Sequence, residues 1–321
     1  MLDRTLVLEI GRVTEVAAIA AARHRGRGNV KAADKAATDA MRKELSYINI
    51  DGTVVIGEGE MDKAPMLYIG EKVGTGRGPA VDIAVDPLEG TSICANNMPN
   101  AFAVIAIAES GGFLHAPDIY MEKIAIGPGF PAGTIDLDAT PQDNIKAVAK
   151  EKGVPVNEIT ACILNRPRHA QLISKVREVG ASVQLISDGD IAGVIWTTDP
   201  IQTNVDIYLG SGGAPEGVLA AAALRCTGGQ MQCRLLPCNE DEQSRAENMG
   251  ADIKRKYGVN EMAFGDVIFS ATGVTGGSFL NGVKFRRDLT ETETVIMRSN
   301  TGTLRRVKTV FKNIDDKMVI T

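Results

Sequence analysis

Residues 81–91 read Val81-Asp-Ile-Ala-Val-Asp-Pro-Leu-Glu-Gly-Thr91, an apolar strand that runs into two carboxylates and a Gly-Thr turn. Because Pro87 has no amide hydrogen to give to a sheet ladder, we expect the strand to stop there. Asp86 and Glu89 then lie at the carboxyl end of the strand, where open α/β sheets bind their ligands. Hard oxygen donors next to free backbone amides suit a divalent cation bound to a phosphate. A polar turn made of ordinary turn residues is the competing interpretation of this segment alone.

The composition is that of a soluble globular protein. The chain has 321 residues, about two domains' worth, with 44% hydrophobic and 23% charged residues. A net charge of -5 argues against a general nucleic-acid binder. Five cysteines form no C-x-x-C pair, which is typical of reduced thiols. Residues 1–10 carry charges where a signal peptide would be apolar, and the longest apolar run, 101–108, is too short to span a bilayer. We therefore expect a cytoplasmic protein that binds neither nucleic acid nor membrane.

Alternating helical and strand patterns predict an α/β chain with more than one sheet. Helical spacing predicts helices over 3–23, 32–47, 142–151, 168–179 and 215–227. Runs rich in Val and Ile predict strands over 53–56, 81–85, 101–108, 160–164, 182–186, 205–208 and 266–270. The polar segment 239–248 is expected to be a solvated loop or a helix edge. The Gly- and Pro-rich segment 127–133 is the candidate hinge between two lobes, 1–133 and 134–321.

Further carboxylates follow or begin predicted elements. Glu58, in Gly57-Glu-Gly-Glu60, follows a strand, and an acidic surface turn would explain it as well. Glu216 falls in the first turn of a helix, where it would also favour the helix dipole. Asp34 lies early in the second helix, where Lys31 could pair with it.

A basic and an acidic turn end two later strands. Arg166 and Arg168 bracket a proline and could form a bidentate phosphate clamp, or simply a basic turn in solvent. His169 is better explained as a capping or surface residue than as a general base. Asp188 and Asp190 could accept hydrogen bonds from sugar hydroxyls, or shape a turn.

Taken together, charged clusters follow five candidate strands, which a purely structural account would have to treat as five coincidences. No Ser-His-Asp or Cys-His arrangement competes, and with three histidines a His-based metal site is poorly supported.

The motifs give the chain a resemblance to a known family. It resembles the class II fructose-1,6-bisphosphatases, bacterial members of the lithium-sensitive sugar and inositol phosphatase superfamily. The superfamily signature Asp-Pro-x-Asp/Glu-Gly-Thr stands at Asp86–Thr91. The class II phrases, in family order, are 51–60, 64–74, 116–121, 166–169, 188–190 and 212–217.

The resemblance implies a fold and a set of site residues. The fold is a layered α-β-α-β-α sandwich of two lobes, the first with most metal ligands and the second with the sugar and distal-phosphate contacts. The implied ligands of Mn²⁺ or Mg²⁺ are Asp34, Glu58, Asp86, Glu89 and Glu216. The implied substrate contacts are Glu89, Gly90, Thr91, Tyr120, Arg166, Pro167, Arg168, Asp188, Gly189, Asp190 and Gly213. Thr91 matches the family's catalytic threonine, and Asp82 is a candidate supporting group.

The resemblance also implies a reaction, the hydrolysis of the 1-phosphate of fructose 1,6-bisphosphate in gluconeogenesis. Sedoheptulose-1,7-bisphosphatase activity, alone or in addition, is the close alternative. Inositol monophosphatase is disfavoured because a monophosphate leaves Arg166 and Arg168 without a distal partner, and the intact ligand set argues against a non-catalytic sensor. A homo-oligomer, dimer or tetramer, is expected. Arg166 stands where relatives often have Lys, and residues 28–31 and 92–99 also depart from the family pattern; these differences bear on substrate preference.

Overall fold

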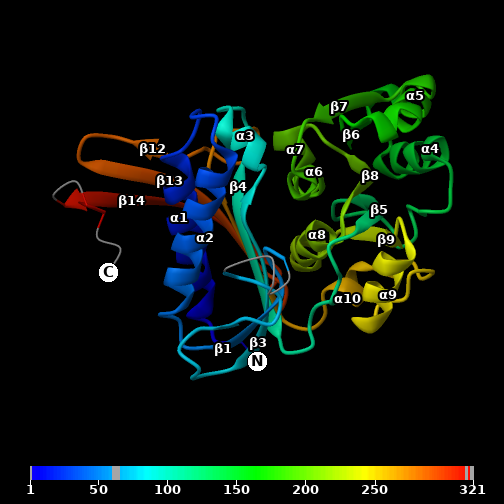
Figure 1. Cartoon of the computed structure of the whole chain (residues 1–321). Coiled ribbons are helices and arrows are strands. Elements are labelled where there is room, and N and C mark those ends of the chain that lie inside the picture. Colours follow the sequence, from blue (N-terminus) through cyan, green and yellow to red (C-terminus); the bar gives the residue numbers. More distant parts are fainter. Residues whose placement is uncertain (1, 60–65, 315–316, 319–321) are drawn as a thin grey trace. The chain divides into compact units, whose positions relative to one another are not determined.

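The computed structural model describes residues 2–59, 66–314 and 317–318 (Figure 1). The chain divides into two compact units, Met1–Gly111 with Gly265–Thr321, and Gly112–Phe264. The predicted boundary at residue 133 falls inside the second unit, which begins at residue 112. The chain returns to the first unit at residue 265. Each unit is described by itself below.

The first unit is built on one mixed sheet. Its described strands are β1 (Asp51–Ile56), β2 (Lys72–Val73), β3 (Ala80–Glu89), β4 (Phe102–Glu109), β11 (Val267–Gly273), β12 (Lys284–Phe285), β13 (Leu289–Arg298), β14 (Thr303–Ile314) and β15 (Lys317–Met318). The order is β15-β14-β13-β11-β4-β3-β1-β2, with β12 on β13. β1 and β3 are parallel, whereas β3, β4 and β11 run antiparallel to one another in turn. The β4–β11 pairing is what returns the C-terminal segment to this unit.

Two helices, α1 (Leu6–Ala22) and α2 (Val30–Leu45), pack side by side, and α1 covers one face of this sheet (Figure 1). The apolar positions of α1 are buried in one core with the strands. A side chain at Gly11 would meet Ile296 Cδ1 at 2.6 Å, so glycine lets α1 approach the sheet closely. Asn29 caps α2, because its side chain accepts a hydrogen bond from the Ala32 amide at 3.0 Å. Both predicted N-terminal helices are confirmed.

Strand β3 does not stop at Pro87, contrary to the expectation. Asp86 pairs with Val104 and Glu89 with Phe102, so Pro87 and Leu88 together lie opposite a single residue of β4. This two-against-one arrangement is a β-bulge, and it removes the proline from the ladder. The Leu88 amide donates instead to Asp86 Oδ1 at 3.0 Å. The bulge therefore carries the strand past the proline and sets the positions of both carboxylates.

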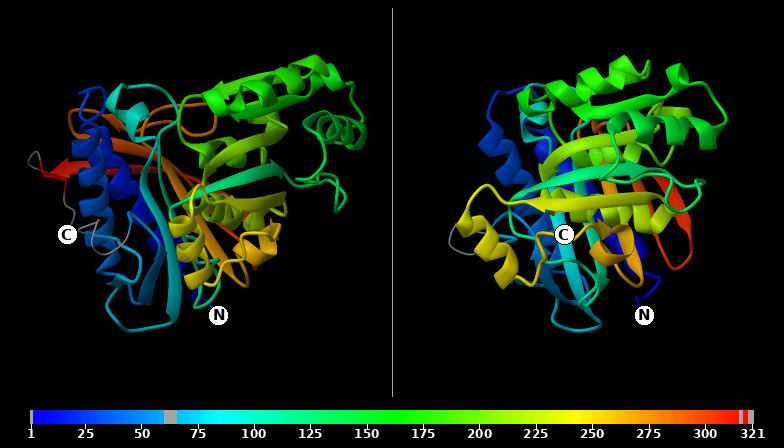
Figure 2. Two further views of the ribbon diagram at one scale, coloured as in Figure 1. Left: turned by 45° about the vertical axis from the view of Figure 1, so that its right-hand side comes forward. Right: turned by 90° about the vertical axis from the view of Figure 1, so that its right-hand side faces the viewer.

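The second unit has a six-stranded mixed sheet. Its strands, in spatial order, are β10 (Tyr257–Gly258), β9 (Gln230–Leu236), β5 (Tyr120–Ile126), β8 (Ile207–Gly213), β6 (Thr160–Leu164) and β7 (Ser182–Ile186). Helices α4 (Pro141–Lys152) and α5 (Ala170–Glu178) lie on one face, and α6 (Asp190–Trp196) and α8 (Ala214–Thr227) on the other (Figures 1 and 2). The predicted α/β class, with more than one sheet, is confirmed.

The remaining described helices are short. They are α3 (Thr91–Ala95), α7 (Pro200–Thr203), α9 (Glu240–Asn248), α10 (Val259–Met262) and the 3-10 turns Val156–Glu158 and Pro167–His169. The segment 239–248, expected to be a loop or a helix edge, forms α9, because Asn239 accepts a hydrogen bond from the Glu242 amide at 2.9 Å and caps it. Within the described ranges, no helix combines the length and the apolar character needed to cross a bilayer.

Candidate active site

The first unit brings four of the predicted metal ligands onto neighbouring elements. Because β1 and β3 are parallel, with Ile56 paired to Ala84, the residues that follow both strands come to the same edge of the sheet. Glu58 follows β1, and Asp86 and Glu89 lie in the last four residues of the strand β3. Helix α2, which packs against β3 and α3, carries Asp34.

The loop after β1 is tightly confined. A side chain at Gly57 would meet the Leu67 carbonyl oxygen at 2.0 Å, so only glycine lets the two backbones pass. The Glu58 amide donates to the same carbonyl at 3.0 Å. Glu58 is therefore held in place by its backbone, while Glu60, the second glutamate of the motif, lies outside the described residues.

The turn after β3 presents the threonine. Gly90 has φ 79° and ψ 52°, the left-handed conformation that favours glycine, and it turns the chain into α3. Thr91 is the first residue of that helix and is half-buried, whereas Glu89 is only 4% exposed. The hydroxyl, two backbone amides and a buried carboxylate thus fall within three consecutive residues.

Burial raises the pKa of Asp34, because water is withdrawn from its carboxylate. The adjacent Lys35 pairs with Asp39 at 2.9 Å. A bound cation would offset the cost of keeping Asp34 ionised, and an all-carboxylate donor set suits a hard divalent ion. Among the described residues, no three His, Cys, Asp or Glu side chains gather closely enough to form a ready metal cluster.

In the second unit, both predicted arginines are held by partners. The Arg168 guanidinium lies 4.7 Å from the centre of the Tyr120 ring, and Tyr120 is 46% exposed. Arg166 pairs with Asp188 at 3.2 Å. Pro167 begins a 3-10 turn that contains Arg168 and that Arg166 precedes. The structure therefore brings Tyr120 to Arg168 and Asp188 to Arg166, as two separate pairs.

Asp190 is committed inside the unit. Its Oδ2 lies 2.6 Å from Lys123 Nζ, with side chains 3% and 0% exposed respectively, and accepts a hydrogen bond from the Tyr208 hydroxyl at 3.1 Å. Gly189, with φ 75°, turns the chain into α6 just before it. The sequence analysis missed Lys123, because its partner Asp190 lies 67 residues away and no residue near Lys123 indicates a buried ion pair.

The glycines of β8 make room for the chain's own carboxylates. A side chain at Gly212 would meet Asp190 Oδ2 at 2.1 Å, and one at Gly213 would meet Glu216 Oε2 at 2.0 Å. The resemblance had implied Gly213 as a substrate contact. Glu216 lies in the first turn of α8, half-buried, with Gly213 at the N-cap position.

The structure gives a hydrogen-bond partner of Asp82 and the burial of His169. Asp82, a candidate supporting group, accepts a hydrogen bond from the Gly111 amide at 2.8 Å, so it fixes the turn after β4. His169 is neither a surface residue nor a side-chain cap: it is 4% exposed, and it precedes α5 without a capping hydrogen bond.

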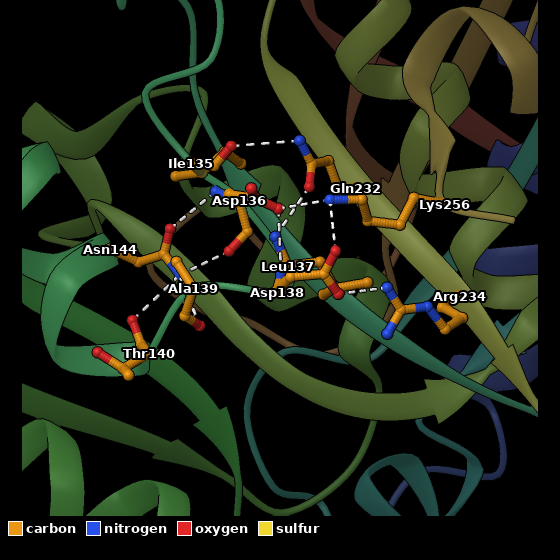
Figure 3. Close-up of polar contacts among 10 residues, drawn as sticks. All are labelled: Ile135, Asp136, Leu137, Asp138, Ala139, Thr140, Asn144, Gln232, Arg234 and Lys256. Atoms are coloured by element: carbon orange, nitrogen blue, oxygen red, sulfur yellow. Dashed lines mark hydrogen bonds and ion pairs between the residues drawn. The ribbon is translucent and has the colours of Figure 1, made fainter. Parts of the chain in front are cut away.

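A cavity of about 380 Å³ lies beside Arg168 within the second unit. Among its lining residues are Glu122, Leu137, Arg168, Lys175 and Leu209. The loop 135–140, which supplies one wall, is fixed by the polar contacts in Figure 3. Lys256 pairs with both aspartates of this loop, and Asn144 and Gln232 bind its backbone.

We expect Asn144→Leu to loosen this loop. Asn144 is 4% exposed, its Oδ1 accepts from the Asp136 amide at 2.9 Å, and its Nδ2 donates to the Asp136 carbonyl at 2.9 Å. Leaving these groups unpaired should lower the free energy of unfolding by about 2 kcal/mol, as measured by urea denaturation. Lys146→Leu, on the exposed side of the same helix, is the control and should stay within about 0.5 kcal/mol of wild type. Equal stabilities of the two variants would contradict the anchoring role.

Comparison with known proteins decides the family. A sequence model described as bacterial fructose-1,6-bisphosphatase, glpX-encoded, matches residues 4–311. The chain belongs to this family. Fructose-1,6-bisphosphatase 1 class 2 of Escherichia coli is 47% identical over 321 aligned residues, which cover 96% of this chain and 95% of that protein. The class 2 enzyme of Shigella flexneri matches with the same identity and coverage. The resemblance inferred from the motifs is confirmed.

A solved structure, an extragenic suppressor from Pyrococcus furiosus, matches this fructose-1,6-bisphosphatase family member with a TM-score of 0.28. The sequences are 12% identical, and the match covers 56% of this chain and 64% of the other. At this score the match carries no weight for the fold or the site.

Proposed function

We propose that this protein hydrolyses the 1-phosphate of fructose 1,6-bisphosphate to give fructose 6-phosphate and inorganic phosphate, a reaction of gluconeogenesis. The observation that carries the proposal is 47% identity to a class 2 fructose-1,6-bisphosphatase over 96% of the chain. The Asp86–Thr91 motif, placed by the bulge of β3, supports it. The protein is expected to act in the cytoplasm as a dimer or tetramer.

The residues suited to hold Mn²⁺ or Mg²⁺ are Asp34, Glu58, Asp86, Glu89 and Glu216. Their all-oxygen chemistry and the raised pKa of Asp34 fit a divalent cation. When bound, such ions would polarise the phosphoryl oxygens and lower the pKa of the attacking water.

The chain's own groups are assigned as follows. The Thr91 hydroxyl orients the attacking water, and the amides of Gly90 and Thr91 steady the reacting phosphate. Tyr120 and the two arginines, spaced by Pro167, bind the phosphate that does not react. The remaining proposed substrate contacts are Asp188, Gly189 and Gly213. Because the Asp190 carboxylate is committed to Lys123 and Tyr208, we assign Asp190 to holding α6 against β5 and β8 rather than to the sugar.

Sedoheptulose 1,7-bisphosphate is the second candidate substrate, because it also carries a phosphate that the arginines could bind. The test compares kcat/KM for fructose 1,6-bisphosphate, sedoheptulose 1,7-bisphosphate and inositol 1-phosphate, each with Mn²⁺, with Mg²⁺ and with a chelator. We expect a bisphosphate to be preferred and the chelator to abolish turnover. A preference for the inositol ester, or turnover that survives chelation, would contradict the proposal.

A further inference from the structure

The 3-10 turn between β6 and α5 buries an imidazole that the proposed chemistry does not use. His169 is 4% exposed. Its Nδ1 lies 2.8 Å from the Leu164 carbonyl oxygen, and its Nε2 lies 2.9 Å from the Ser211 amide nitrogen and 3.0 Å from Ser211 Oγ. A side chain at Gly210 would come within 3.2 Å of the ring, so glycine lets the imidazole lie against β8.

The partners of His169 define its protonation state. A carbonyl oxygen only accepts hydrogen bonds, so Nδ1 must carry the proton that reaches Leu164. A backbone amide only donates, so Nε2 must be bare to accept from Ser211. Both contacts are satisfied only by the neutral ring with its proton on Nδ1.

Ser211 links His169 to Arg168 through hydrogen bonds. The Arg168 Nε group donates to Ser211 Oγ at 3.0 Å, and one terminal nitrogen donates to the Ser211 carbonyl at 2.7 Å. Since the hydroxyl accepts from Arg168, its own proton is available for His169 Nε2. Each group therefore donates a hydrogen bond to the next, from Arg168 to the Ser211 hydroxyl, then to His169, and then to the Leu164 carbonyl.

These hydrogen bonds leave the Arg168 guanidinium oriented to bind an anion. Two of the five guanidinium N–H groups are used on Ser211, and the exposed guanidinium lies over the Tyr120 ring. A long side chain already held in one conformation loses less freedom when it binds a phosphate.

We propose that neutral His169 is a positioning residue that acts through Ser211 to hold Arg168 ready for the second phosphate of the substrate. The inference rests on the proposed function, in which Arg168 binds the phosphate that does not react. It assigns a role to two residues, His169 and Ser211, that are not in the motif-based set of contacts.

Protonation should disrupt the arrangement. A proton on Nε2 would face the Ser211 amide, donor against donor. Burial lowers the pKa of His169, the nearby positive charges of Arg168 and Arg166 lower it further, and the Leu164 hydrogen bond and the Asp190 charge oppose the shift. The ring therefore stays neutral to lower pH than an ordinary histidine, and the arrangement should fail only when the pH falls below the ordinary histidine pKa of 6.5.

The test measures substrate preference, defined as kcat/KM for fructose 1,6-bisphosphate divided by kcat/KM for fructose 1-phosphate. His169→Leu removes both contacts and should lower the preference roughly tenfold, the lower end of the range for a lost hydrogen bond to a charged group. His169→Gln, whose amide oxygen can accept from Ser211, should recover most of it, whereas His169→Asn, which reaches only Leu164, should not. The exposed His115→Gln is the matched control and should leave the preference at the wild-type value.

Two further arms separate the possible failures. Arg168→Ala should lower the preference at least as much as His169→Leu, and the double variant should lose no more than Arg168→Ala alone. As the pH is lowered below the ordinary histidine pKa, the wild-type preference should fall more steeply than that of His169→Gln. An unchanged preference in Arg168→Ala overturns the assignment of Arg168 and this inference with it. Loss in Arg168→Ala with none in His169→Leu, or equal loss in all three His169 variants, overturns the role of His169 alone.

Discussion

Thr91→Ala is expected to lower kcat about 10²- to 10⁴-fold, the usual contribution of a positioned group that orients or transfers a proton. The left-handed turn at Gly90 presents the Thr91 hydroxyl at the start of α3, next to the buried Glu89. Thr91→Ser keeps a hydroxyl on the same carbon and should retain part of the rate, because only the methyl group that restricts its rotamers is lost. The measurement is phosphate release at saturating fructose 1,6-bisphosphate and Mn²⁺.

Asn96→Ala is the control for this region. Asn96 is the exposed C-cap residue of α3, and its side-chain amide donates to the Ser92 carbonyl at 2.9 Å. Its kcat should stay within about twofold of wild type, as expected for a surface substitution. Equal kcat values for Thr91→Ala and Thr91→Ser would show that the hydroxyl is not used.

Asp190→Ala should lower the free energy of unfolding by about 3–5 kcal/mol, because it leaves the Lys123 ammonium buried without its counter-ion. The lysine side chain is 0% exposed, and the Tyr208 hydroxyl loses its acceptor in the same variant. Urea denaturation followed by circular dichroism measures the loss. Asp241→Ala, which removes an aspartate that is 84% exposed from an ion pair with Arg245, should change stability by less than about 1 kcal/mol.

The double variant Lys123→Met with Asp190→Asn tests the cause. It removes both charges, and the Asn side chain still offers an oxygen to Tyr208, so most of the lost stability should return. If Asp190→Ala instead unfolds like wild type but loses affinity for the sugar bisphosphate, then the carboxylate contacts substrate and the buried pair is not its main role.

Local patterns were enough to predict the elements whose apolar spacing is strong. The helices α1 and α2 and the continuous apolar run of β4 all follow from residues close in sequence. Strand β13 was missed because its buried side reads Thr290, Thr292 and Thr294, polar residues that are at most 2% exposed. Thr272 pairs with Thr294 at 2.8 Å and with Thr14 at 2.7 Å, so buried hydroxyls satisfy one another where a pattern search looks for hydrocarbon.

Other features depended on pairings far along the chain. The extension of β3 past Pro87 needs the bulge against β4, and the division into units needs β11 to pair with β4. Motif spacing predicted residue types for the site but not their partners. That Asp190 meets Lys123, and His169 meets Ser211, follows from the pairing of β5 with β8 and of β6 with β8, which no local signal specifies.

The most direct test of the central assignment is to identify the products of fructose 1,6-bisphosphate by ³¹P NMR after incubation with the protein and Mn²⁺. The account predicts one inorganic phosphate per sugar, with fructose 6-phosphate as the other product, since Thr91 and its neighbouring carboxylates act on the 1-phosphate while the arginines keep the 6-phosphate. Accumulation of fructose 1-phosphate, or no release of phosphate at all, would contradict it.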